Sequence, residues 1–194
     1  MNLIWNPKTT PSELHSVLRT LGSEYPFREG NEGVNLTFER NSDPEVLRVT
    51  RRGEIFHVSY GRDSIAARGV AYALSRQECD ERIAFKTYGI LFDCTRGSVM
   101  KVDSFKRWLR RLALMGYNMA MLYTKDAYQV PGEPYFGYMR GAYSKEEMKE
   151  VDAYAQSLKI EIIASIQALG HLEPILRWPA YAPVTDTANV ILVD

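Results

Sequence analysis

Three short apolar segments of the chain each run into side chains that can do chemistry. The first, "YGILFD", ends in Asp93 and is followed by Arg96; "YNMAMLY" leads to Asp126, and "IEIIASIQ" leads to His171 and Glu173. A carboxylate beside an imidazole can transfer a proton, and a guanidinium can hold two neighbouring hydroxyl groups. The carboxylates and the imidazole could instead bind a divalent metal in an isomerase or hydrolase. Residue types alone leave both kinds of site open.

The segments between these apolar runs have the pattern of amphipathic helices. "SKEEMKEVDAYAQSLK" begins with Ser144 and Glu147 at capping-box spacing. In "VDSFKRWLRRLALMG" the predicted buried face contains Phe105, Trp108, Leu109 and Leu112. Apolar strands that alternate with such helices predict a parallel βαβαβ sheet, with its strands adjacent in sequence order. The C-terminal ends of parallel strands meet at one edge, so we expect the reactive side chains to gather there.

Residues 1–82 are predicted to form a small α+β accessory domain. "TTPSELHSVLRTLG" has the pattern of a helix with a capping box between Thr10 and Glu13, and "VNLTFER", "LRVTR" and "EIFHVSY" alternate like half-buried strands. Gly53 indicates a hairpin between the last two strands, and "DSIAARGVAYALSR" a second helix over the sheet. We see no reactive cluster in this domain and assign the function to residues 83–194.

The composition excludes several classes of partner. The chain has 194 residues with 24 Lys and Arg against 24 Asp and Glu, so it has no basic field to attract nucleic acid or an anionic membrane. No segment approaches the ~18 apolar residues of a membrane span. Cys79 and Cys94 lack the spacing of a metal or redox motif, which indicates reduced thiols. We expect a cytoplasmic protein that binds a neutral or mildly polar ligand, without a cofactor or metal.

The strand ends resemble those of family 20 glycoside hydrolases, which are retaining β-N-acetylhexosaminidases. That family's first barrel strand carries Gly-x-x-x-Asp-x-x-Arg, and this chain has Gly89, Asp93 and Arg96. The second carries Asn and then His-Leu-Thr-Asp, where this chain has Asn118 and "YTKD". The third ends in Pro-Gly-His, where this chain has Leu169, Gly170 and His171. The segment "RGAYSKEE" is also similar to the one that leads into the family's second barrel helix.

The chain departs from the family's pattern at two positions. Tyr88 stands where the family commonly has an Arg that holds the sugar's hydroxyl groups, and Tyr123 stands where it has a His. Arg96 is therefore our candidate for the hydroxyl clamp. A salt bridge between Arg96 and Asp93 that fixes the end of the strand is the alternative.

The resemblance implies a fold, a substrate class and roles for the candidate residues. The fold is α/β: the accessory domain followed by a (β/α)8 barrel, of which this chain holds the first three strands. The substrates are β-linked N-acetylhexosaminide glycans or glycoconjugates, whose own 2-acetamido oxygen acts as the nucleophile. Asp126 and His171 correspond to a hydrogen-bonded relay that contacts the general acid. Asp93, Arg96 and Glu173 are assigned to substrate binding.

The general acid itself has no counterpart in this chain. In the family it belongs to an Asp-Glu pair after the fourth strand, and the only Asp-Glu dipeptide here is Asp80-Glu81, predicted to lie in the linker before the barrel. A closed barrel takes about 250 residues, far more than follow Tyr88. We therefore interpret the chain as the N-terminal portion of a longer enzyme. Alone, we expect it to be inactive and to self-associate through the open edge of the third strand.

Aromatic residues in two loops allow a further alternative. Tyr135, Phe136 and Tyr138 lie in the loop after the second strand, and Trp178 and Tyr181 follow the third. Such rings can stack on the apolar face of a sugar, or they can simply cover the end of the barrel. A non-catalytic carbohydrate-binding module thus stays open beside the metal-dependent barrel enzyme.

Overall fold

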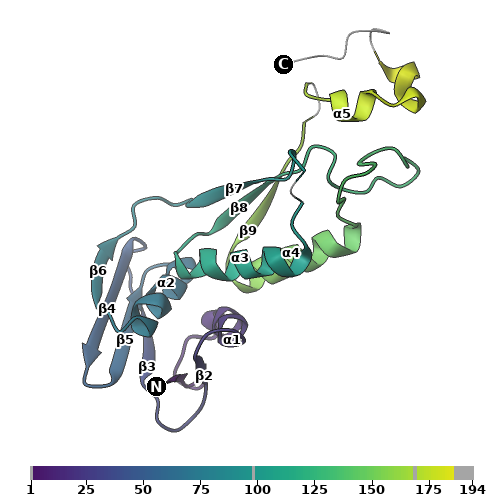
Figure 1. The fold of residues 1–194 in the computed structure, drawn as a ribbon. Helices are drawn as coiled ribbons and strands as arrows, with labels where there is room; N and C mark the ends of the chain where they lie inside the picture. Colours follow the sequence, from purple (N-terminus) through teal and green to yellow (C-terminus); the bar gives the residue numbers. More distant parts are fainter. Residues whose placement is uncertain (1, 98, 168–169, 186–194) are drawn as a thin grey trace.

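The computed structural model describes residues 2–97, 99–167 and 170–185 (Figure 1). A short parallel pair of strands, β1 (Leu3–Trp5) and β2 (Phe27–Glu29), comes first, with η1 (Ser12–Leu14) and α1 (His15–Gly22) between them. The next elements are β3 (Leu36–Arg40), β4 (Val46–Arg52), β5 (Ile55–Tyr60), α2 (Asp63–Leu74) and β6 (Cys79–Arg82). The last are β7 (Gly89–Asp93), α3 (Val102–Leu114), β8 (Met119–Tyr123), α4 (Lys145–Ser157), β9 (Glu161–Ser165), α5 (Glu173–Leu176) and η2 (Pro179–Val184). Within the described ranges, no helix is both long and apolar enough to cross a membrane.

The first half of the chain contains a four-stranded sheet with the strand order β3-β5-β4-β6. β4 and β5 make the antiparallel hairpin predicted at Gly53, whose φ of 60° is a left-handed conformation that glycine adopts readily. β3 pairs with β5 in the parallel direction, and β6 pairs with the other side of β4. α2 packs on β4 and β5, which places a helix between this sheet and the second half of the molecule (Figure 1).

The dipeptide Asp80-Glu81 lies in β6, so the prediction that it belongs to a linker is wrong. Glu81 accepts hydrogen bonds from Arg68 Nε and Nη2 at 2.8 and 3.0 Å and from the Tyr72 hydroxyl. The bonds from Arg68 are the main reason that the pKa of the Glu81 carboxyl lies below its ordinary value. Arg68 also donates to the carbonyl of Met115, just after α3, at 3.0 Å. Glu81 thus joins β6 to α2 and α3, and this structural role agrees with its rejection as a general acid.

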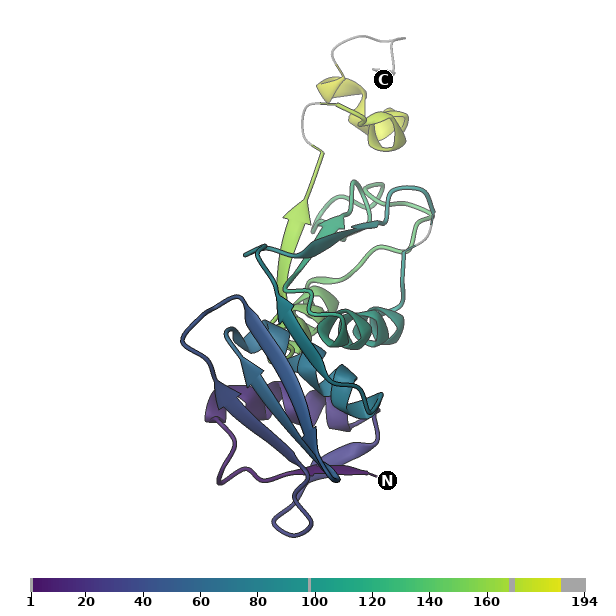
Figure 2. The ribbon, with the colours of Figure 1, turned by 90° about the vertical axis from the view of Figure 1, so that its left-hand side faces the viewer.

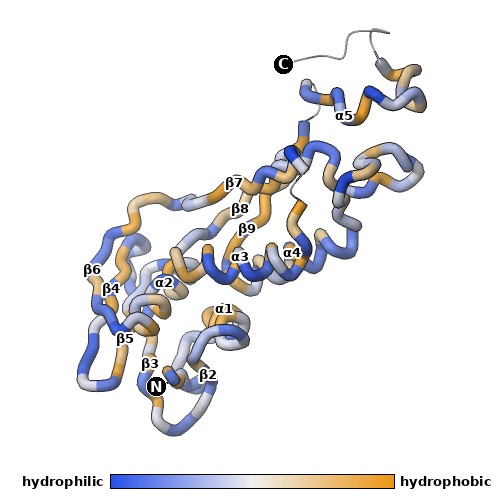
Figure 3. Tube along the Cα trace, in the orientation of Figure 1, coloured by the Kyte–Doolittle hydropathy of each residue, from blue (hydrophilic) through white to orange (hydrophobic). Residues whose placement is uncertain are grey.

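β7, β8 and β9 form a parallel sheet in sequence order, which confirms the predicted topology. α3 and α4 cover one face of this sheet (Figures 1 and 2). Ala120 and Leu122 of β8 are fully buried on the covered face, whereas Leu91 of β7, on the opposite face, is 52% exposed. In Figure 3 hydrophobic residues run along the strands, while α3 and α4 carry many hydrophilic ones.

The two capping boxes predicted from the sequence have different outcomes. At α4, Ser144 Oγ accepts a hydrogen bond from the Glu147 backbone, and the Glu147 carboxylate accepts one from the Ser144 backbone, which confirms that box. The box at Thr10 and Glu13 is wrong, because the chain forms η1 there, before α1 begins. Glu13 instead pairs with Arg40, 3.1 Å away. A long-range ion pair thus replaces the local contact.

Trp108 of α3 corrects the predicted buried face of that helix. Phe105, Leu109 and Leu112 are buried as predicted, but Trp108 is 41% exposed. Its ring meets the edge of Phe92, with centroids 6.5 Å apart, and therefore lies at the margin of the core.

One hydrophobic core runs from the four-stranded sheet through α2 and α3 to the parallel sheet. Polar contacts reinforce it on the side of α1: the hydroxyls of Thr20 and Ser157 lie 3.0 Å apart. Arg110 of α3 donates to the Tyr154 hydroxyl at 2.5 Å and pairs with Glu24. Because the two parts share this core, their division into domains at residues 82 and 83 stays a prediction.

Replacement of Glu81 tests how strongly the two halves depend on each other. We expect Glu81→Gln to lower the free energy of unfolding at neutral pH by about 1–3 kcal/mol, since charge-assisted hydrogen bonds from Arg68 are lost. The pKa of Glu81 is lowered in the folded state, so its contribution is complete above the ordinary value of 4.5 and is lost as the pH falls further. Urea unfolding measured from pH 7 to pH 3 should therefore show a weaker acid dependence in Glu81→Gln.

The neighbouring carboxylate provides the control. Asp80 pairs with Arg48 at 2.8 Å, but both side chains are more than half exposed, and such pairs contribute only about 0–1 kcal/mol. Asp80→Asn should thus change stability little. Equal losses in the two variants would contradict the role given to Glu81.

Candidate functional site

The C-terminal ends of the three parallel strands lie in one row. Asp93 of β7 is in register with Tyr123 of β8, and Tyr123 is in register with Ser165 of β9. Because these residues hold equivalent places in the pleat, their side chains leave the same face of the sheet, opposite to α3 and α4. Asp93 and Tyr123 were expected at this end of the sheet; Ser165 was not, although the alternation of side chains along β9 from Glu161 indicates it.

Asp93 is held by the turn that follows β7. Its carboxylate accepts hydrogen bonds from the hydroxyl and the backbone N–H of Thr95, both at 2.7 Å. The bond from the Thr95 hydroxyl is the main cause of the lowered pKa of Asp93. Arg96 is exposed, and within the described residues it makes no ion pair with Asp93, so the salt bridge weighed as an alternative is not formed. The Arg96 guanidinium is therefore accessible to a ligand.

Asp126 is the most buried of the five candidate residues, with 1% of its surface exposed. Its Oδ1 atom lies 3.1 Å from Nε of Arg140 in an ion pair. Arg140 also donates a hydrogen bond of 2.8 Å to the carbonyl of Cys94, directly after β7. The Nε–H group is not directed at Oδ1, and this buried oxygen accepts no hydrogen bond within the described residues. Such an unsatisfied buried acceptor is uncommon and often indicates a functional site.

The loop between β8 and α4 folds back onto Asp126. Gly137 has a φ of 70°, and a Cβ atom there would lie 2.4 Å from the Asp126 carbonyl oxygen. The Arg140 backbone N–H donates to the Gly137 carbonyl at 3.0 Å, and this turn brings the guanidinium to Asp126. Neither Gly137 nor Arg140 was predicted as a site residue. The only signal for Arg140 was its place at the start of "RGAYSKEE".

His171 and Glu173 follow β9 in a more open setting. His171 is exposed and has a φ of 56°, which is uncommon for residues other than glycine. Glu173 is the first residue of α5 and is exposed as well. Leu169, part of the match to the family's third strand, lies outside the described residues. The hydrogen bond between Asp126 and His171 stays a prediction.

Two of the loop tyrosines pack against Trp178. The rings of Tyr135 and Trp178 are stacked, with centroids 5.8 Å apart, and Tyr138 meets Trp178 edge to face at 5.1 Å. Phe136 packs instead against Tyr128, with centroids 4.9 Å apart. We call Tyr135, Tyr138 and Trp178 the aromatic cluster. These contacts favour the covering role for its rings over a flat, open platform for sugars.

Tyr88 and Asn118 lie at the other end of the parallel sheet. Asn118 accepts a hydrogen bond from the Tyr88 backbone and donates one to the Lys86 carbonyl, both at 2.7 Å. The Tyr88 ring stacks on Tyr117, with centroids 4.1 Å apart. Tyr88 directly precedes β7 and Asn118 directly precedes β8. Their hydrogen bond therefore joins the two strands at their N-terminal ends, away from Asp93.

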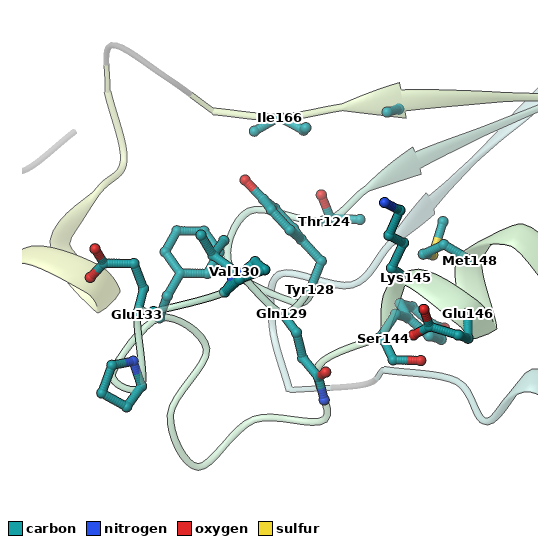
Figure 4. Close-up of a pocket in the computed structure, with 16 residues that line it drawn as sticks. Thr124, Tyr128, Gln129, Val130, Glu133, Ser144, Lys145, Glu146, Met148 and Ile166 are labelled. Atoms are coloured by element: carbon teal, nitrogen blue, oxygen red, sulfur yellow. The ribbon is translucent and has the colours of Figure 1, made fainter.

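A cavity of about 930 Å³ lies outside the row of strand ends (Figure 4). It is bounded by the β8–α4 loop, the start of α4, and Ala164 and Ile166 of the β9 segment. In Figure 4 the Thr124 and Tyr128 side chains point towards Ile166. Ala164 is in register with the buried Leu122, so the cavity adjoins the face that carries the helices. None of the five candidate residues lines it, and we do not assign the chemistry to it.

The structure does not support the metal-dependent alternative. In the part of the chain that it describes, no three His, Cys, Asp or Glu side chains converge as metal ligands. Asp93, Asp126, His171 and Glu173 therefore do not form a ligand set. Asp126 faces the cation of Arg140 instead.

Comparisons with known proteins identify the fold. No protein-family model and no curated protein sequence matches the chain. Among solved structures, the family 20 exo-β-N-acetylglucosaminidase of Vibrio harveyi in complex with N-acetylglucosamine has a TM-score of 0.74 at 17% identity, over 91% of this chain and 34% of that one. The β-N-acetylhexosaminidase of Bacteroides fragilis has a TM-score of 0.69 at 15% identity, over 94% of this chain and 44% of that one. The family 20 β-N-acetylhexosaminidase of Streptomyces coelicolor has a TM-score of 0.64 at 17% identity, over 90% of this chain and 44% of that one.

These likenesses confirm the fold that the sequence resemblance implied. The chain has an α+β accessory unit followed by part of an α/β barrel, and this arrangement matches those structures over 90% or more of its length. It covers 34% to 44% of the length of these proteins. At such low identities the comparisons establish the architecture, and activity is argued separately below.

Alanine at Gly137 tests the packing of the loop on Asp126. Gly132, in the same loop, has a φ of 85° but no atom near the position of a Cβ, so Gly132→Ala carries only the cost of the left-handed backbone. Gly137→Ala carries that cost and a clash with the Asp126 carbonyl. We expect it to lose about 1–3 kcal/mol more unfolding free energy than Gly132→Ala, measured by urea denaturation. Equal losses would show that the loop does not pack closely there.

Proposed function

We propose that the chain is part of an exo-acting, retaining β-N-acetylhexosaminidase, which removes terminal N-acetylglucosamine or N-acetylgalactosamine from glycans or glycoconjugates. The observation that carries this proposal is the row of strand ends, in a fold similar to the Vibrio harveyi N-acetylglucosaminidase over 91% of the chain. The side chains that match the family's motifs, Asp93 and Asp126, stand at this edge or in the loop directly beyond it. In this proposal the acetamido oxygen of the substrate is the nucleophile.

The candidate residues divide into two groups under this proposal. Asp126 and His171 form the relay: the carboxylate fixes the imidazole tautomer, and the other ring nitrogen steers the general acid. The buried Asp126 Oδ1, which lacks a hydrogen bond within the described residues, supplies the acceptor that an imidazole N–H needs. Arg96, Asp93 and Glu173 are exposed and bind the hydroxyl groups of the sugar.

The general acid and the carboxylate that orients the acetamido group are not assigned to this chain. Its only Asp-Glu dipeptide lies in β6, where Glu81 is bound to Arg68 and Tyr72. The 194 residues therefore supply the accessory sheet, three strands and the relay, and the pair belongs elsewhere in the enzyme. A carbohydrate-binding module without catalysis is the competing function, and it predicts sugar binding without turnover.

Hydrolysis of aryl glycosides tests the proposal. The complete enzyme should release nitrophenol from the β-N-acetylglucosaminide, the β-N-acetylgalactosaminide or both, and not from the β-glucoside, which lacks the acetamido nucleophile. Equal rates on the glucoside, or binding of N-acetylglucosamine without any turnover, would contradict the proposal.

Asp126→Asn tests the relay. Without the carboxylate charge the imidazolium is less stable, and we expect kcat to fall by about 10²- to 10⁴-fold. The variant should also be less stable, because Arg140, whose side chain is only 17% exposed, loses its counter-ion.

A double variant separates these two effects. In Asp126→Asn/Arg140→Gln both charges are removed, so stability should partly return, as followed by thermal unfolding. Activity should stay low if Asp126 serves the relay. Recovery of kcat together with stability would show that Asp126 acts only as the partner of Arg140.

The 194-residue chain by itself should not hydrolyse the aryl substrates. Within the described residues β9 pairs only with β8, so its other edge presents unpaired backbone groups, and we expect association of copies on sizing chromatography. Measurable turnover by the monomeric chain would contradict our assignment of the missing pair.

A further inference from the structure

The segment that carries His171 and Glu173 reaches the rest of the molecule through aromatic rings. Beyond β9, the short helix α5 packs on η2, and the backbone hydrogen bonds of both are local. Trp178 lies at the junction of α5 and η2. Its backbone N–H donates a hydrogen bond of 3.3 Å to the Ile175 carbonyl, and its backbone carbonyl accepts one of 2.9 Å from the Tyr181 backbone N–H. From this junction the Trp178 ring contacts Tyr135 and Tyr138.

Two further side chains, Tyr181 after α5 and Glu133 in the β8–α4 loop, influence each other electrostatically. Burial raises the pKa of the Tyr181 hydroxyl, and the carboxylate of Glu133, in the β8–α4 loop, raises it further. In Figure 4 the Glu133 side chain extends towards the short helix that follows β9. The ring contacts of the aromatic cluster join these two segments.

The tyrosines of the cluster belong to the loop that encloses Asp126. Gly137 lies between Tyr135 and Tyr138 in the sequence and packs against the Asp126 carbonyl. Arg140, two residues beyond Tyr138, pairs with the Asp126 carboxylate. A continuous path of contacts thus leads from Asp126 through this loop to Trp178, and α5 connects Trp178 to the residues just after His171.

We propose that Trp178 is a positioning residue, which holds the segment of His171 against the loop of Asp126 through the aromatic cluster and so sets the distance between the two relay groups. This inference rests on the proposed function for its catalytic meaning, but the mechanical coupling is a property of the chain alone. The segment of His171 continues into α5 and η2, and Trp178 lies at the junction of these two short helices. From there the Trp178 ring contacts both tyrosines of the opposite loop.

Histidine NMR of the 194-residue chain tests the coupling without any activity. The chain has three histidines, and His15 and His57 lie in the accessory part, where they serve as internal references. With ¹³C-labelled histidine, Trp178→Ala should shift and broaden the His171 imidazole signal and leave the other two unchanged, and Trp178→Phe should largely restore it. Tyr135→Ala should act in the same direction although it changes only the opposite loop. Trp108→Ala, which removes an exposed Trp on α3, is the control and should have no effect.

The catalytic consequence is measured in the complete enzyme. A misplaced relay group should lower kcat by about 10- to 100-fold with little change in KM, and Trp178→Phe should recover most of the loss. An unchanged His171 signal in both Trp178→Ala and Tyr135→Ala would overturn the positioning role. A rise in KM at constant kcat would also overturn it and would make Trp178 a sugar contact. A perturbed His171 signal in a protein without hexosaminidase activity would leave the coupling in place and refute the proposed function instead.

Discussion

The parallel, in-register pairing of β7, β8 and β9 is the constraint on which the candidate site depends. It places Asp93, Tyr123 and Ser165 in one row, and the pairing continues one residue further, where Cys94 N–H donates to the Tyr123 carbonyl and Thr124 N–H to that of Ser165. The loops after the three strands therefore start at the same level and from the same edge. A shift of one residue in any strand would turn its row of side chains from this face to the face of the helices.

Beyond the strand ends, the site is organised by a buried charge. Asp126 is almost fully enclosed, and the neighbouring cation of Arg140 compensates for the loss of hydration. That compensation requires the loop to turn back sharply, which the left-handed Gly137 allows because it has no side chain to collide with the Asp126 carbonyl. The same loop then presents Tyr135 and Tyr138 to Trp178. The ion pair thus fixes the shape of the β8–α4 loop, and the aromatic cluster joins this loop to the segment after β9.

The sequence predicted the parts of the fold that local patterns control. Apolar strands between amphipathic helices predicted the parallel sheet, and the adjacent Ser144 and Glu147 formed their capping box. Where the predictions were wrong, long-range contacts determined the structure. Glu13 pairs with Arg40 and does not form the predicted capping box. The polar segment that contains Glu81 forms a strand because it pairs with the free edge of β4. The three-residue strands β1 and β2 are too short to show a period. The candidate site followed the same rule, since Asp93 and Asp126 come directly after strands, whereas Arg140 lies far along an irregular loop.

The central proposal is that this chain is part of an enzyme whose substrate provides its own nucleophile. The most direct test is the rate at which the complete enzyme hydrolyses nitrophenyl β-glucosaminides whose 2-acetamido group carries none, one, two or three fluorine atoms. Fluorine withdraws electrons from the amide oxygen, so our account predicts that kcat/KM falls steeply with each substitution. Rates that do not depend on fluorination would show that the nucleophile comes from the protein or from water, and would contradict the account.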